Sequence, residues 1–205
     1  MQATRILTTS LLALFLSLQL ACKDEEAGAP GATSASGAVA ANALTALPSS
    51  AVILAEQNQV VSYNPDGNKG WAFTLPDNDS VAARPVAALS STTYVRGAQG
   101  LYAIAPDGKL MWQAKHAGAN DSLKGITPLS DSTVAITVGD NSLVGYNAQG
   151  QPKWTFKVPD GDKITALPTL AASSIVYVRS AKKIYAVDSQ GNLAWQAEIG
   201  QNAKK

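Results

Sequence analysis

The tryptophans of this chain recur at a nearly constant spacing of 41, 42 and 41 residues. The four of them are Trp71, Trp112, Trp154 and Trp195. Each one follows a glycine by four residues, and these glycines are Gly67, Gly108, Gly150 and Gly191. A repeat of about 40 residues with strand and turn content is the size of one small sheet in a stack or ring. The spacing therefore predicts four copies of one small sheet, most often arranged as a β-propeller.

Each repeat contains two short segments rich in β-branched and aromatic residues, which is the composition of half-buried strands. They are Ala51–Ala55 and Val60–Asn64, Thr92–Arg96 and Leu101–Ala105, Thr133–Val138 and Leu143–Asn147, and Ser174–Arg179 and Ile184–Asp188. The glycine follows at a turn, where it supplies a positive φ, and the tryptophan lies on the next strand. No stretch after the N-terminal segment shows helical periodicity with capping residues. The predicted fold class is all-β.

The third strand and the turn of the even repeats carry a family pattern. Leu101–Ile104 followed by Gly108 and Trp112 resembles a blade of the quinoprotein-type, or PQQ-like, β-propeller family. Ile184–Asp188 with its glycine and tryptophan resembles it still more closely, and the resemblance covers about residues 43 to 200. In that family the tryptophans dock between adjacent blades, so the resemblance implies a structural role for all four tryptophans and their glycines. The expected blades are residues 43–80, 81–121, 122–162 and 163–205.

The repeats alternate in an A-B-A-B order. Odd repeats read Tyr-Asn at residues 63–64 and 146–147, whereas even repeats read Tyr-Ala at 102–103 and 185–186. One second-strand position holds Ala55 and Val138 in odd repeats but Arg96 and Arg179 in even ones. Two arrangements fit: a closed four-bladed ring, or half of a dimeric eight-bladed ring. The repeats begin and end nearly flush, which favours the closed ring.

The N-terminus resembles a bacterial lipoprotein signal. Arg5 precedes a mostly apolar run, Ile6–Leu20, whose 15 residues would span only about 22 Å as a helix, short of a hydrocarbon core of roughly 30 Å. Leu18–Cys22 resembles the lipobox, so residues 1–21 are expected to be a signal peptide and Cys22 the lipidated residue. Residues 22–42 are dominated by Ala, Gly and Ser and predict a flexible tether to the propeller of residues 43–205. Lys23 favours the outer membrane over inner-membrane retention.

Charge and chemistry exclude several classes of protein. Removal of residues 1–21 leaves 15 basic and 15 acidic residues, with no basic run for nucleic acid. His116 is the single histidine, and the oxygen-rich segments Asp77–Asp79 and Asp160–Asp162 lack the full calcium-loop pattern. We therefore predict no catalytic residue, no cofactor and no metal site. In a closed ring Arg96 and Arg179 would lie opposite each other, which makes them a speculative site for an anion.

The resemblance implies a non-catalytic, lipid-anchored protein of the bacterial envelope that acts as an interaction scaffold, because some PQQ-like lipoproteins of outer-membrane protein assembly use the blades without a cofactor. The expected partner is an envelope protein, with a homodimer as a further form and with the membrane reached through the lipid alone. A propeller that binds a small ligand or a glycan is the alternative. A quinoprotein-type enzyme fragment is a third reading, against which the missing quinone and calcium ligands argue.

Overall fold

The computed structural model describes residues 42–116, 121, 123–171 and 174–200, so the expected signal peptide and Cys22 lie outside it. Sheet 1 contains β1 (Asn42–Ala46), β2 (Val52–Glu56), β3 (Gln59–Tyr63) and β4 (Lys69–Thr74). Sheet 2 contains β5 (Val86–Ala87), β6 (Thr93–Arg96), β7 (Gly100–Ile104) and β8 (Leu110–Lys115). Sheet 3 contains β9 (Ile126–Pro128), β10 (Val134–Val138), β11 (Ser142–Tyr146) and β12 (Pro152–Lys157). Sheet 4 contains β13 (Thr169–Leu170), β14 (Val176–Arg179), β15 (Lys183–Val187) and β16 (Leu193–Glu198).

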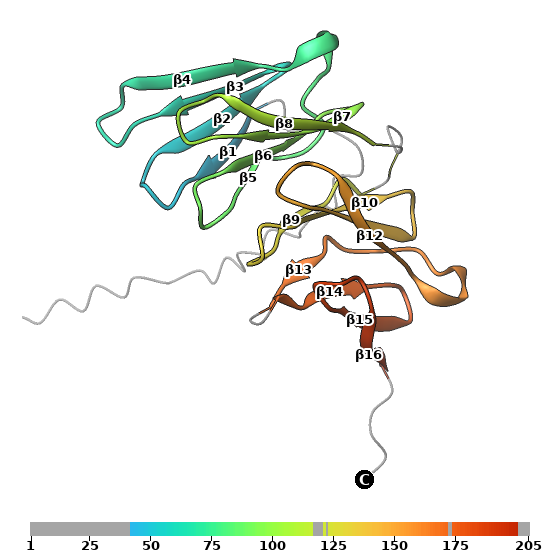
Figure 1. Ribbon diagram of the computed structural model, residues 1–205. Coiled ribbons are helices and arrows are strands. Elements are labelled where there is room, and N and C mark those ends of the chain that lie inside the picture. Colours follow the sequence, from blue (N-terminus) through green and yellow to red (C-terminus); the bar gives the residue numbers. More distant parts are fainter. Residues whose placement is uncertain (1–41, 117–120, 122, 172–173, 201–205) are drawn as a thin grey trace, which may run out of the picture. The chain divides into compact units, whose positions relative to one another are not determined.

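Every sheet is an antiparallel meander in which each strand pairs with the next one along the chain. Figure 1 shows the four sheets following one another in chain order, with sheet 1 and sheet 4 at the two ends. The described residues include two single helical turns, η1 (Pro76–Asn78) and η2 (Pro159–Gly161), each just after an odd sheet. The prediction of an all-β fold built of four small sheets is confirmed.

The hydrophobic core lies between consecutive sheets. One cluster joins sheets 1 and 2 around Ile53 and Val95, a second joins sheets 2 and 3 around Leu101 and Ile136, and a third joins sheets 3 and 4. A single sheet buries its apolar residues only against a neighbour, so each junction contributes to the stability of both sheets that it joins. Within the described residues these three clusters account for the junctions from sheet 1 to sheet 4.

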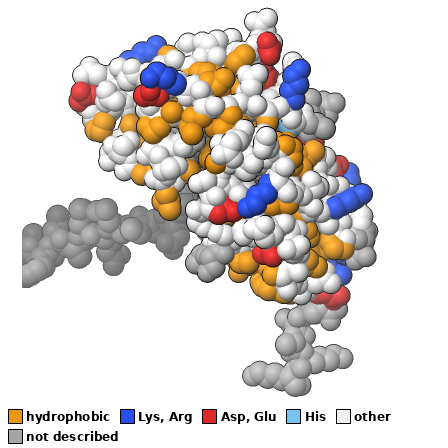
Figure 2. All heavy atoms as spheres, in the orientation of Figure 1, with side chains coloured by type: hydrophobic (Ala, Val, Ile, Leu, Met, Phe, Trp, Pro, Cys, Tyr) orange, Lys and Arg blue, Asp and Glu red, His pale blue; other side chains and the backbone are white. Residues whose placement is uncertain are grey.

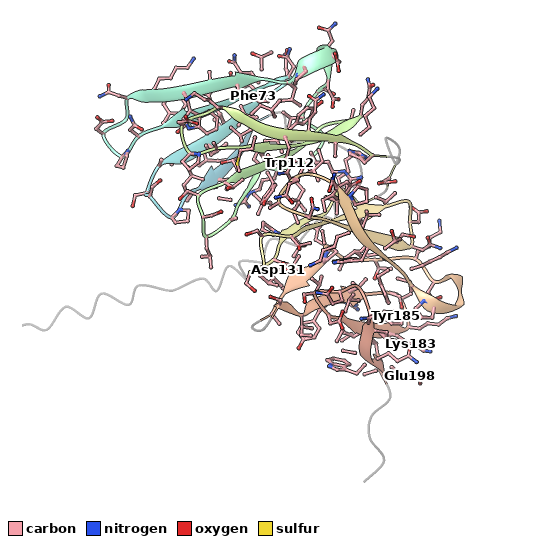
Figure 3. The ribbon with its side chains drawn as sticks, in the orientation of Figure 1. Phe73, Trp112, Asp131, Lys183, Tyr185 and Glu198 are labelled. Atoms are coloured by element: carbon pink, nitrogen blue, oxygen red, sulfur yellow. The ribbon has the colours of Figure 1, made fainter. Side chains whose placement is uncertain are left out.

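A tryptophan closes each of the three junctions by lying against the turn glycine of the next sheet. A Cβ atom added at Gly108 would lie 2.6 Å from Trp71 Cβ, and one at Gly150 would lie 2.5 Å from Trp112 Cε3. Gly191 meets Trp154 in the same way at 2.8 Å. These contacts leave no room for a side chain, and the positive φ of these turns also favours glycine. Trp112 is labelled in Figure 3, where sheets 2 and 3 meet.

The fourth tryptophan and the first glycine are not paired in this way. A Cβ added at Gly67 would meet nothing within 4 Å, although its φ of +82° matches that of the other turn glycines. Trp195 is 47% exposed, and every residue of β16 is exposed. Sheet 4 therefore does not cover sheet 1 as the other sheets cover each other. The closed four-bladed ring favoured by the flush repeats is not the arrangement of the described chain.

The strand register refines one detail of the A-B-A-B pattern. Arg96 pairs with Leu101 and Arg179 with Ile184, and in sheet 3 the residue that pairs with Leu143 is Thr137. The counterpart of the two arginines is therefore Thr137, and the sequence comparison that placed Val138 there was wrong by one residue. The reason is that the paired residues Thr137 and Leu143 are 6 positions apart in the chain, whereas Arg96 and Leu101, like Arg179 and Ile184, are 5 apart.

We expect Gly150→Ala to destabilise the protein much more than Gly139→Ala. Both glycines have positive φ, which costs alanine about 1–2 kcal/mol, but a Cβ at Gly139 meets nothing within 4 Å. The additional collision with Trp112 in Gly150→Ala costs about 1–3 kcal/mol, or roughly 2–12 °C in melting temperature. Thermal unfolding followed by circular dichroism measures both. Equal shifts for the two variants would show that the tryptophan does not depend on this glycine.

Candidate functional site

A large hollow in the described chain runs along the innermost strands. It has a volume of about 560 Å³ and is lined by residues of β5, β9 and β13, by the turns that follow β5 and β9, and by Pro48 of sheet 1. Leu89, which is 91% exposed, lies on its rim, and Leu170, Pro128 and Ile126 contribute further apolar surface. The polar side-chain groups of its described lining residues are serine, threonine and tyrosine hydroxyls, and none of these described residues is charged. This chemistry suits an apolar segment of a protein better than an anion or a metal ion.

Aspartates in the segments between the sheets accept hydrogen bonds that hold the turns. Asp79 accepts several of these bonds. Its buried carboxylate accepts hydrogen bonds from the backbone N–H of Gln99 (3.1 Å) and of Gly100 (3.0 Å) and from the hydroxyl of Tyr102 (2.8 Å). Burial, together with the neighbouring carboxylate, raises the pKa of Tyr102 above its ordinary value. Gly97 permits this arrangement, because a Cβ there would lie 2.1 Å from Asp79 Oδ2.

In sheet 4 a serine binds the backbone N–H groups of the corresponding turn. Ser180 occupies the position of Gly97, and its hydroxyl accepts the backbone N–H groups of Lys182 (3.2 Å) and Lys183 (3.0 Å). The same hydroxyl donates to Asp162, which is the counterpart of Asp79 (3.2 Å). With the carboxylate engaged there, the buried hydroxyl of Tyr185 has no hydrogen-bond partner among the described residues. Figure 3 labels Tyr185, which packs against Phe156 of sheet 3 with ring centroids 6.2 Å apart.

Arg96 is part of the junction between sheets 2 and 3. Its side chain is completely buried and forms an ion pair with Asp121, which lies in the segment between those sheets. Arg96 also donates to Thr137 Oγ1 (3.1 Å), while Asp121 accepts the N–H of Gly139 (2.8 Å). Burial lowers the pKa of Arg96, and the bond to Asp121 opposes this change. Because its charge is already paired inside the protein, Arg96 does not offer an open anion site.

Arg179 has different surroundings although it occupies the same strand position. It is exposed at the end of β14, on a face that also carries Tyr177 (38% exposed) and Trp195 (47% exposed). Tyr177 and Trp195 pack on each other with ring centroids 5.5 Å apart. Figure 2 shows hydrophobic side chains at the surface of the lower part of the protein, where sheet 4 lies. The two arginines that the sequence suggested as a pair therefore have separate environments, one sealed inside a junction and one on an open face.

The described residues hold no group of three or more His, Cys, Asp or Glu side chains able to bind a metal ion. His116 lies at the end of β8 with Nε2 3.3 Å from the carbonyl oxygen of Gly97. Asp77 lies on the single turn η1 with a positive φ of 56°, whereas the carboxylate of Asp79 is buried and accepts hydrogen bonds at the junction. Among the described residues, no helix has the length and apolar character needed to cross a membrane.

Comparison with protein families supplies the assignment. The family model described as outer membrane protein assembly factor BamB matches residues 56–205, which is more than half of the chain. The chain belongs to this family. No curated protein matches the chain. The BamB family match begins in β2 and therefore includes all four tryptophans and their glycines.

Solved structures agree on the fold. BamB from Moraxella catarrhalis aligns with 80% of this chain and 52% of its own length, at 17% identity and a TM-score of 0.55. Virginiamycin B lyase from Staphylococcus aureus aligns with 78% and 55% of the two chains, at 17% identity and a TM-score of 0.63. The Pan2 WD40 domain of Neurospora crassa aligns with 77% and 50%, at 13% identity and a TM-score of 0.56. The chain thus spans about half the length of these three structures.

The linker aspartates were missed as a set by the sequence comparison, although a signal for them exists. Asp79, Asp121 and Asp162 recur at 42 and 41 residues, which is the period of the tryptophans. In the sequence, Asp79 and Asp162 were considered only as parts of oxygen-rich segments that lack the calcium-loop pattern, and Asp121 was not considered. Superposing the aspartates on the repeat, as was done for tryptophan and glycine, would have indicated one buried or half-buried carboxylate at each junction.

Tyr102→Phe and Tyr185→Phe are a matched pair that tests the aspartate network. We expect Tyr102→Phe to lower the free energy of unfolding by about 1.5–3 kcal/mol, because it removes a hydrogen bond to a charged group. Tyr185→Phe removes a buried hydroxyl without a described partner, so it should leave the stability unchanged or raise it. Urea unfolding at pH 7 measures both.

The same pair predicts an alkaline effect. Because the pKa of Tyr102 is raised in the folded protein, its contribution is fully present below the unfolded-state pKa of about 10 and is lost as the pH rises above it. The difference between wild type and Tyr102→Phe should therefore shrink above about pH 10. Equal losses for both tyrosine variants at pH 7 would contradict the role given to Asp79.

Proposed function

We propose that this protein is a lipid-anchored, non-catalytic scaffold of the bacterial envelope that binds a protein partner in outer-membrane protein assembly. The observation that carries this proposal is the BamB family match over residues 56–205. The proposed location is the periplasmic face of the outer membrane. Virginiamycin B lyase shares the fold at 17% identity, and that likeness does not extend to its activity.

The partner is proposed to dock at the hollow along β5, β9 and β13. Its lining is apolar with scattered hydroxyl groups, and Leu89 projects from the rim almost fully exposed. An exposed large apolar residue beside a concave surface is a typical anchor of a protein interface. The absence of charged residues from this lining favours a neutral, apolar segment of the partner over a charged ligand. A second copy of the chain is a further partner that we propose, at a different surface.

The anchor is proposed to be a lipid on Cys22, reached through the tether of residues 22–42. We expect the wild-type protein to fractionate with membranes and the Cys22→Ser variant to appear in the soluble periplasmic fraction, because a cysteine thiol is the attachment point. Immunoblotting of the two fractions, with mass spectrometry of the N-terminal peptide, checks this. Membrane association that survives Cys22→Ser, with no lipid on the wild-type peptide, would exclude the anchor.

Crosslinking in intact cells tests the docking surface. A tagged wild-type chain should capture one envelope protein in stoichiometric amount, and Leu89→Lys should reduce the captured amount at least roughly tenfold, as expected for loss of an apolar anchor. Met111→Lys, at another exposed apolar residue outside the hollow, is the matched control and should capture as much as wild type. Equal capture by all three chains would rule out the hollow as the docking site. Capture of no envelope protein by wild type would rule out the scaffold function itself.

A further inference from the structure

Two sheet faces of this protein are left uncovered at the ends of the row of sheets. On sheet 4 the uncovered face carries Tyr177, Arg179 and Trp195, all exposed. On sheet 1 it carries the turn glycine Gly67 and Leu44, which is 59% exposed. Burial of such apolar surface is the main force that joins sheets, so each face lacks a neighbour that the inner sheets have.

The open face of sheet 4 is a copy of a face that is covered elsewhere in the chain. Its counterpart on sheet 2 carries Tyr94 (5% exposed) and Arg96 (0% exposed), both buried by sheet 3. The aromatic pair is already in the docked arrangement on both sheets, because the Tyr94–Trp112 ring centroids are 5.9 Å apart and those of Tyr177–Trp195 are 5.5 Å apart. Sheet 4 thus has, on its exposed face, the same aromatic arrangement that sheet 2 uses to bind sheet 3. An odd sheet, like sheet 3, would fit this face.

Sheet 1 is of that type. Gly67 has the same turn position and positive φ as Gly150, which accepts Trp112, but no atom of the described residues lies within 4 Å of its Cβ position. On the same sheet Leu54 and Tyr63 are partly exposed, whereas their counterparts Ile136 and Tyr146 in sheet 3 are buried at 0% and 4%. The glycine face of sheet 1, which we call the acceptor face, and the tryptophan face of sheet 4, which we call the donor face, therefore match each other, and both are exposed.

We infer that a second copy of this chain covers these faces, with sheet 4 of each copy docked on sheet 1 of the other. Trp195 of one copy lies on Gly67 of the other at each of two equivalent junctions, and the two halves close an eight-bladed ring about a twofold axis. The new junction repeats the one between sheets 2 and 3, with the same donor and acceptor types. Sheets 1 and 4 lie at opposite ends of the row of sheets (Figure 1).

Charge at the junction agrees with this pairing. Arg96 pairs with Asp121, in the segment between sheets 2 and 3, and also donates a hydrogen bond to Thr137 of sheet 3. The counterpart of Thr137 in sheet 1 is Ala55, and the residue after it, Glu56, is exposed at the end of β2. Glu56 of one copy is therefore placed to pair with Arg179 of the other. This assembly does not depend on the envelope partner, since Leu89 and the hollow lie on the inner strands.

Mass measurement of the purified chain tests the assembly. The full chain carrying Cys22→Ser, exported and purified, is examined by light scattering after size exclusion between about 1 and 100 µM. The expected result is twice the monomer mass, with dissociation only at the lowest concentrations. Trp195→Lys should raise the dimer dissociation constant by roughly 100-fold, the effect of removing a central tryptophan from an interface. Leu89→Lys is the matched control and should remain dimeric.

A second variant separates head-to-tail closure from other dimers. Gly67→Asn blocks the acceptor while tolerating the positive φ, so it should also be monomeric on its own. Mixing it with Trp195→Lys restores one native junction per pair, and the mixture should contain more dimer than either variant alone. A wild-type chain that is monomeric at every concentration overturns the inference. So does a dimer that Trp195→Lys leaves intact, or a mixture with no restored dimer.

Discussion

The contact between a tryptophan and the turn glycine of the next sheet is the interaction on which the rest of this structure depends. None of the four sheets has enough apolar surface to be stable alone, and the hydrophobic clusters all lie where two sheets meet. The indole fills the space that a missing side chain leaves at the glycine, so the two residues are required together. Loss of either one loosens the junction and exposes the faces of both sheets.

The charged network completes what the tryptophans begin. Apolar contact holds two sheets together but sets their relative position only loosely, whereas a carboxylate that accepts several hydrogen bonds fixes one arrangement. Asp79 ties the turn after sheet 1 to the β6–β7 turn of sheet 2, and Asp121 joins Arg96 of sheet 2 to Gly139 of sheet 3. The junction after an odd sheet therefore differs from the junction after an even sheet. This difference is the structural basis of the A-B-A-B pattern in the sequence.

Much of this fold follows from the printed sequence. The 41- and 42-residue spacing of tryptophan and glycine predicted the sheets, and the β-branched segments located β2, β3 and their counterparts within one or two residues. The surroundings of the arginines did not follow, because Arg96 and Arg179 both end a Tyr-Val-Arg strand and the sequence does not show that another sheet covers only one of them. Whether the four sheets form a closed ring could not be predicted either, because the start and end points of the repeats do not determine whether sheet 4 contacts sheet 1. The hollow along the inner strands required the structure, because its lining residues come from all four repeats.

Hydroxyl-radical footprinting of the four tryptophans, read by mass spectrometry of each peptide across a range of protein concentrations, tests the central claim most directly. We predict that Trp71, Trp112 and Trp154 stay protected at every concentration, whereas Trp195 is oxidised rapidly in dilute protein and becomes protected as the concentration rises. Similar oxidation rates for all four tryptophans, independent of concentration, would contradict the account that glycine-docked tryptophans hold these sheets together and that one of them awaits a partner.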